Sequence, residues 1–176
     1  MSQLTKRVIT IPSTVEISLT AQKILAQGPA GKNELLLNPE IEVIREAEKI
    51  WIKSNNLALT GTFNSLIYNL ILGVEKGYQA ILDVKGVGYK VNLRDRMLEL
   101  TVGNSHLDYI PIPPELKIEI KGNRITIIGS EKQKVFAFAK HIRTLRPPSI
   151  YKENKGIYLL GEDNNIKLRP GKTLRK

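Results

Sequence analysis

The sequence predicts an α+β protein made of two tandem, similar domains, each a mostly antiparallel sheet with one helix packed on it, followed by an extended basic C-terminal tail. Three observations support this. Two segments repeat their apolar residues with the period of a helix, each follows a pair of strand-like runs, and the two sets lie about 75 residues apart. We therefore expect an N-terminal repeat over residues 1–77, a C-terminal repeat over 78–148 and the extension over 149–176.

In the first repeat, strands are expected at residues 41–45 and 49–53, on either side of a polar turn. A helix is expected over residues 60–76. Gly77 follows this segment, and glycine commonly ends a helix because it adopts left-handed backbone angles without steric cost. The apolar positions of the expected helix form one wide face: Phe63, Leu66, Ile67, Leu70, Ile71 and Val74.

In the second repeat, residues 116–120 and 125–128 alternate isoleucine with polar residues, which is typical of strands with one buried face. A helix is expected over residues 130–145, where Ser130 and Gln133 have the spacing of a capping box. The apolar stripe of this helix is Val135, Phe138, Ile142 and Leu145, and Pro147 and Pro148 end it.

Charge separates the two repeats. From Glu131 to the C-terminus there are twelve lysines and arginines and four acidic residues, a net charge of +8 out of +10 for the whole chain. Such asymmetry favours a polyanionic partner, because each neutralised phosphate of a nucleic acid releases condensed counterions. The alternative is a solvated basic tail without a specific partner.

Composition argues against several other classes of function. The chain has no cysteine, which excludes disulfides, cysteine-based zinc sites and thiol catalysis. His106 and His141 have no second metal ligand at helical spacing, and close neighbours such as Ser105, His106 and Asp108 rarely reach triad geometry. No apolar run approaches the length of about 20 residues that spans a bilayer. We therefore expect no catalytic site, metal, cofactor, small-molecule substrate or membrane.

Two features leave both interpretations open. The segment Lys85-Gly-Val-Gly-Tyr-Lys90 is interpreted as a bulge in a bent strand, or as a backbone surface that contacts RNA between two lysines. Tyr151 and Tyr158 flank Lys152 and Lys155. Either tyrosine could stack on a base while the lysines contact phosphates, or anchor the extension on its own domain.

Several segments together resemble the family of large ribosomal subunit protein six, of the bacterial and organellar type. The resemblance covers nearly the whole chain and includes residues 7–12, 61–66, 73–78 and 84–90. Its most specific segment is Arg143-Thr-Leu-Arg-Pro-Pro-Ser-Ile-Tyr-Lys152. The chain departs from the family pattern at Glu153-Asn154, where one glycine is usual, and at Leu107, where proline is usual.

The resemblance implies a structural constituent of the large ribosomal subunit, not an enzyme. It implies contact with large-subunit ribosomal RNA near the region that translational GTPases approach, and with neighbouring large-subunit proteins. An RNA-binding regulator outside the ribosome is the alternative. The expected RNA-binding residues are Lys85, Lys90, Lys140, His141, Arg143, Arg146, Tyr151, Lys152, Lys155, Lys167, Arg169, Lys172, Arg175 and Lys176.

Residue usage suggests where that ribosome works. Isoleucine, lysine and asparagine are abundant and alanine is scarce, as expected for an AT-rich genome. With the departures from the common bacterial pattern, this favours a mitochondrial ribosome. A plastid ribosome and the bacterial cytoplasm are the alternatives.

Overall fold

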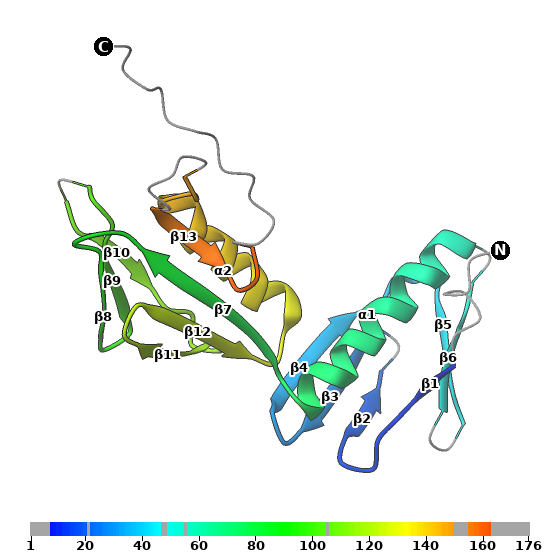
Figure 1. The fold of residues 1–176 in the computed structure, drawn as a ribbon. Coiled ribbons are helices and arrows are strands. Elements are labelled where there is room, and N and C mark those ends of the chain that lie inside the picture. Colours follow the sequence, from blue (N-terminus) through cyan, green and yellow to red (C-terminus); the bar gives the residue numbers. More distant parts are fainter. Residues whose placement is uncertain are drawn as a thin grey trace, which may run out of the picture. The chain divides into compact units, whose positions relative to one another are not determined.

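The computed structural model describes residues 8–20, 22–46, 49–54, 56–104, 106–149 and 155–162, and it confirms the α+β class (Figure 1). The chain forms two compact units. The first contains Met1–Tyr78 together with the short segment Gly129–Lys132, and the second contains Gln79–Ile128 and Gln133–Lys176. The boundaries predicted at residues 77 and 148 stay predictions.

The first unit has two three-stranded antiparallel sheets and one helix. The sheets have the strand orders β2-β3-β4 and β1-β6-β5, and α1 contacts β3, β4 and β6. The elements are β1 (Ile9–Thr10), β2 (Glu16–Leu19), β3 (Lys23–Gly28), β4 (Gly31–Leu36), β5 (Glu42–Glu46), β6 (Lys49–Lys53) and α1 (Leu57–Glu75).

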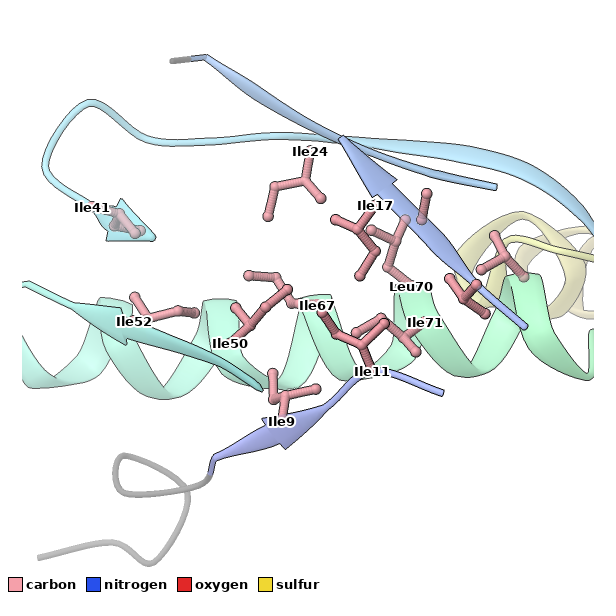
Figure 2. Close-up of a cluster of buried hydrophobic side chains, with 13 residues drawn as sticks. Ile9, Ile11, Ile17, Ile24, Ile41, Ile50, Ile52, Ile67, Leu70 and Ile71 are labelled. Carbon is pink, nitrogen blue, oxygen red and sulfur yellow. The ribbon is translucent and has the colours of Figure 1, made fainter. Parts of the chain in front are cut away.

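The core of this unit consists almost entirely of branched aliphatic side chains, which pack well from both strands and helix. Figure 2 shows Ile67, Leu70 and Ile71 of α1 facing isoleucines from both sheets, among them Ile24 and Ile50. By length and composition alone α1 could cross a membrane, but its apolar face belongs to this core. The predicted apolar face is therefore confirmed as a packing surface except at Leu66, which is only partly buried and does not belong to this cluster.

The helix α1 begins three residues before the predicted start because Asn56 caps it. The side-chain oxygen of Asn56 accepts a hydrogen bond from the backbone N–H of Ala58 at 3.0 Å. At the other end, the N–H of Gly77 donates to the carbonyl of Gly73 at 3.0 Å, and Gly77 has φ +75°. The prediction that Gly77 ends the helix is confirmed.

The second unit also combines two sheets with one helix. The sheets have the strand orders β11-β12-β7-β13 and β10-β9-β8, and α2 packs on β7 and β12. The elements are β7 (Tyr78–Lys85), β8 (Lys90–Arg94), β9 (Met97–Thr101), β10 (Asp108–Pro111), β11 (Lys117–Lys121), β12 (Arg124–Gly129), α2 (Lys132–Leu145) and β13 (Gly156–Leu159).

The predicted hairpin of the second unit is confirmed in its register. Ile118 lies opposite Ile127, and Ile120 opposite Ile125, as expected for residues that share one buried face. The helix α2 begins two residues after the predicted start, and the hydroxyl of Ser130 donates to the carbonyl of Lys32 at 3.4 Å. The Ser130 hydroxyl therefore bonds to Lys32 rather than to the first turn of α2, where the predicted capping box would have placed its bond.

The predicted extension contains a strand that the sequence analysis did not expect. Residues Gly156–Leu159 lie in the predicted extension, yet they form β13, which pairs antiparallel with the last half of β7. Ile157 and Tyr158 are buried there, with exposed fractions of 0% and 3%. This part of the extension therefore belongs to the core of the second unit.

Candidate nucleic-acid interface

The described residues of the predicted site fall on two regions of the second unit. Lys140, His141 and Arg143 lie on α2, whereas Lys85, Lys90, Arg146 and Lys155 lie at strand ends and at the exit of α2. The remaining predicted residues lie outside the described part of the chain: Tyr151, Lys152, Lys167, Arg169, Lys172, Arg175 and Lys176. The altered loop at Glu153-Asn154 also lies outside it.

The helix α2 separates a buried stripe from a basic outer face. Val135, Ala139 and Ile142 are at most 1% exposed, and they recur at the spacing of successive helical turns. Lys140 and His141 follow the buried Ala139 and point to the exposed side. No ion pair involves either of them among the described residues. This face can therefore contact an anionic partner without breaking an internal contact.

Arg143 differs from Lys140 and His141, because it forms an ion pair with an acidic residue. Its guanidinium donates from Nε and from a terminal nitrogen to the two carboxylate oxygens of Glu162, and the Nε distance is 3.0 Å. The hydrogen bond from Arg143 lowers the pKa of Glu162; partial burial opposes this, and the backbone N–H of Leu159 adds to it. Arg143 thus ties α2 to the turn that follows β13, and the carboxylate of Glu162 competes with a phosphate for its guanidinium.

Lys132, the first residue of α2, also has an internal role. Its Nζ donates to the side-chain oxygen of Asn69 at 3.3 Å and lies 5.7 Å from the ring centroid of Tyr78. These three residues all belong to the first unit. In the second unit, Lys134 of α2 pairs with Glu115 and Arg143 pairs with Glu162, which leaves Lys140 as the lysine of this helix segment without an acidic partner among the described residues.

A second group of cations lies where β7 and β13 meet. Lys85 is paired with Gly156 in the strand register, and its Nζ lies 5.2 Å from the ring centroid of Tyr158. Because Tyr158 is 3% exposed, its ring cannot stack on a base. Tyr158 therefore anchors the extension on its own domain, and the alternative interpretation, stacking on a base, does not apply to it.

The exit of α2 runs beside the start of β13. The N–H of Ile157 donates to the carbonyl of Arg146 at 2.9 Å, and the N–H of Ser149 donates to the carbonyl of Lys155 at 2.8 Å. A Cβ on Gly156 would lie 2.7 Å from the Cα of Pro148, so a glycine is required at this approach. Sequence reasoning did not single out Gly156, because the close approach comes from Pro147 and Pro148, which precede it by eight or nine residues.

The glycine-rich segment is a loop between two strands rather than a bulge within one. It links β7 of the four-stranded sheet to β8 of the three-stranded sheet. Val87 at its tip is 94% exposed, whereas Tyr89 is 7% exposed. Lys85 and Lys90 stand exposed at its two ends. Contact of this loop with RNA stays a prediction.

Of the three residue types of a triad, the structure describes His106 and Asp108. His106 lies 3.1 Å from Asp108 through Nε2 and Oδ1, with a side chain that is 72% exposed. Asp108 also accepts from the side-chain nitrogen of Asn104 at 2.9 Å, and Ser105 lies outside the described residues. No group of three potential metal ligands occurs among the residues that the structure describes.

Comparison with known proteins identifies the family. A sequence profile described as "Ribosomal protein L6" matches residues 85–157, which include both basic regions. The large ribosomal subunit protein uL6 of Aquifex pyrophilus is 43% identical, over 92% of this chain and 91% of its own length. The same protein of Helicobacter pylori strain HPAG1 is 37% identical, with full coverage of both chains. That of Hydrogenobaculum sp. is 38% identical, over all of this chain and 98% of its own. Similarity at this level over the full length shows that the chain belongs to the family of large ribosomal subunit protein uL6.

Proposed function

We propose that this chain binds large-subunit ribosomal RNA through the outer face of α2, the exit of that helix and Lys90, which follows the Tyr89 that contacts Arg146 at that exit. It would do so as a structural constituent of the large ribosomal subunit, beside neighbouring ribosomal proteins. The observation that carries the proposal is the pair formed by Lys140 and Arg146, which are exposed and have no acidic partner among the described residues. Such cations form charge-assisted hydrogen bonds with phosphate oxygens, and each phosphate that they neutralise releases condensed counterions.

Two finer statements belong to the same proposal. The site lies near the region of the subunit that translational GTPases approach, as the family resemblance implies. The bacterial relatives support a bacterial cytoplasmic ribosome at least as well as the predicted mitochondrial ribosome. A regulator outside the ribosome would share the basic face but would separate from large subunits in a salt wash.

A charge-matched pair of triple variants tests the RNA contact in the full-length chain. The first replaces Lys90, Lys140 and Arg146 with alanine, and the second replaces Lys32, Lys49 and Lys53, which are exposed strand residues of the first unit. Both variants lose three positive charges. Binding to transcribed large-subunit ribosomal RNA is measured at several salt concentrations, with circular dichroism as the check on folding.

The first variant is expected to lower the slope of log affinity against log salt by about three units, one for each lost phosphate contact. The second is expected to change it by less than about one unit. Equal losses in both variants would show a diffuse electrostatic interaction and would contradict the proposed surface. Release of the wild-type chain from large subunits at high salt would favour the regulator instead.

A further inference from the structure

Arg146, the first residue after α2, is held at two points. Its carbonyl accepts the N–H of Ile157 at 2.9 Å, and its Nε donates to the hydroxyl of Tyr89 at 3.2 Å. The residue is nevertheless exposed. Among the described residues the two terminal nitrogens of its guanidinium have no partner. The bond to Tyr89 therefore restrains the side chain and leaves its phosphate-binding end open.

The ring of Tyr89 packs closely against two glycines, Gly86 and Gly103, where any side chain would collide with it. A Cβ on Gly86 would lie 2.7 Å from the ring at Cδ2 and Cε2, and a Cβ on Gly103 would lie 3.1 Å from Cε1. Gly103 also has φ +79°, which other residues adopt at a cost. With Tyr89 7% exposed, the ring fills a slot between the two glycines and its hydroxyl has one position.

We infer that Tyr89 is a positioning residue for Arg146, which presents its terminal nitrogens as a preorganised fork to one phosphate of the RNA. The inference rests on the proposed function and adds to it the hydrogen bond that restrains the Arg146 side chain before RNA binds. An arginine side chain loses much rotamer freedom when it binds, and a restraint already present in the free protein reduces that loss. A planar guanidinium also needs a defined orientation to engage two phosphate oxygens. The hydroxyl of Tyr89 sets this orientation from a segment 57 residues away in the chain.

The variant Tyr89→Phe isolates the hydroxyl, because phenylalanine keeps the ring that the two glycines accommodate. The matched control is Tyr109→Phe, which removes a hydroxyl from a tyrosine of the same unit that is 52% exposed. Both are made in the full-length wild-type chain and in the Arg146→Ala background. Affinity for large-subunit ribosomal RNA and its salt slope are measured for all of them.

Tyr89→Phe is expected to weaken binding about three- to tenfold in the wild-type background, the ordering cost of one side chain, with an unchanged salt slope. Arg146→Ala is expected to lower the slope by about one unit. In the Arg146→Ala background, Tyr89→Phe should have no further effect, and Tyr109→Phe should be neutral throughout. An equal loss from Tyr89→Phe in both backgrounds, or no loss in either, overturns the inference.

A second measurement separates this inference from the proposed function. The Nε–H signal of Arg146 in the NMR spectrum of the free protein should shift and exchange faster with water in Tyr89→Phe, because the hydrogen bond is lost. An unchanged signal overturns the inference even if the chain binds RNA. Strong binding that Arg146→Ala does not weaken refutes instead the proposed phosphate contact, whatever the NMR result.

Discussion

The two helices of this chain are built for different surfaces. In α1, Glu75 is the one charged residue among 19, and the polar side chains of Thr60 and Asn64 are buried with the apolar face. In α2, buried residues form one narrow stripe, and the outer face carries Lys140 and His141. The same architectural element thus packs a core in the first unit and presents charge in the second.

The ion pairs of the two units also differ, in their exposure and in the elements that they connect. Lys23 and Glu34 of the first unit lie 3.3 Å apart on neighbouring strands, with side chains 44% and 58% exposed. In the second unit, Arg143 and Glu162 are 32% and 24% exposed and join a helix to the end of a strand. The first pair lies on the exposed surface of a sheet. The second connects α2, which carries part of the proposed interface, to the segment that follows β13.

The largest effect that would test this contrast is expected at Gly73 of α1. A Cβ there would lie 2.1 Å from the carbonyl oxygen of Ser130, which belongs to the same unit. Gly73→Ala should therefore destabilise the protein by about 1–3 kcal/mol, although alanine favours a helix by about 1 kcal/mol. Ala137→Ser on the exposed face of α2 should change stability by no more than about 0.5 kcal/mol. Urea denaturation measures both, and a neutral Gly73→Ala would break the comparison.

A smaller effect is expected at Glu162, and it depends on pH. Since the folded state lowers the pKa of this group, the ionised form stabilises the fold at a pH above the unfolded-state pKa. That stability is lost as the pH falls through the folded-state pKa. Glu162→Gln should therefore cost about 1 kcal/mol near pH 7 and progressively less as the pH falls below the unfolded-state pKa and through the folded-state pKa.

Glu34→Gln is the matched control for this prediction. The side chains of Glu34 and its partner Lys23 are more exposed than those of Glu162 and Arg143, so the substitution should cost less than about 0.5 kcal/mol at either pH. Denaturation curves of the three proteins across the pH range give the comparison. Equal costs for the two glutamine variants would show that the Arg143 pair has no special structural role.

The smallest effect on stability is expected at Lys140. Because its side chain is exposed and has no ion pair among the described residues, Lys140→Gln should change the free energy of unfolding by less than about 0.5 kcal/mol. It should still lower the salt slope of RNA binding by about one unit, whereas Lys49→Gln should not. A large loss of stability in Lys140→Gln would place this residue in the fold rather than on the interface.

Membership of the uL6 family confirms the prediction of a ribosomal, non-enzymatic protein. Local patterns were also enough for both helices and for the hairpin that precedes each of them. The apolar period of α1, the alternating isoleucines of β11 and β12 and the glycine after α1 all act within a few residues, so one segment of sequence contains the cause. The start of α1 was misplaced by three residues because its cap, Asn56, precedes the first apolar residue of the periodic face.

The candidate site was less predictable, because its residues acquire their roles from distant partners. Arg143 and Arg146 lie three residues apart in one basic segment, and charge alone ranks them equally. Glu162, 19 residues later, engages Arg143, and Tyr89, 57 residues earlier, restrains Arg146. Lys132 likewise donates a hydrogen bond to a distant residue, Asn69.

The sequence by itself determined the α+β class, the repeated helix-and-hairpin pattern, the concentration of positive charge after Glu131 and the resemblance to the family. Each of these depends on residue type and short-range spacing. Tertiary structure decided which cations remain available, that Tyr158 is an anchor and that Gly156–Leu159 completes a sheet. These outcomes depend on contacts between segments that are far apart in the chain, and hydrogen-bond geometry over such separations is set by packing rather than by local pattern.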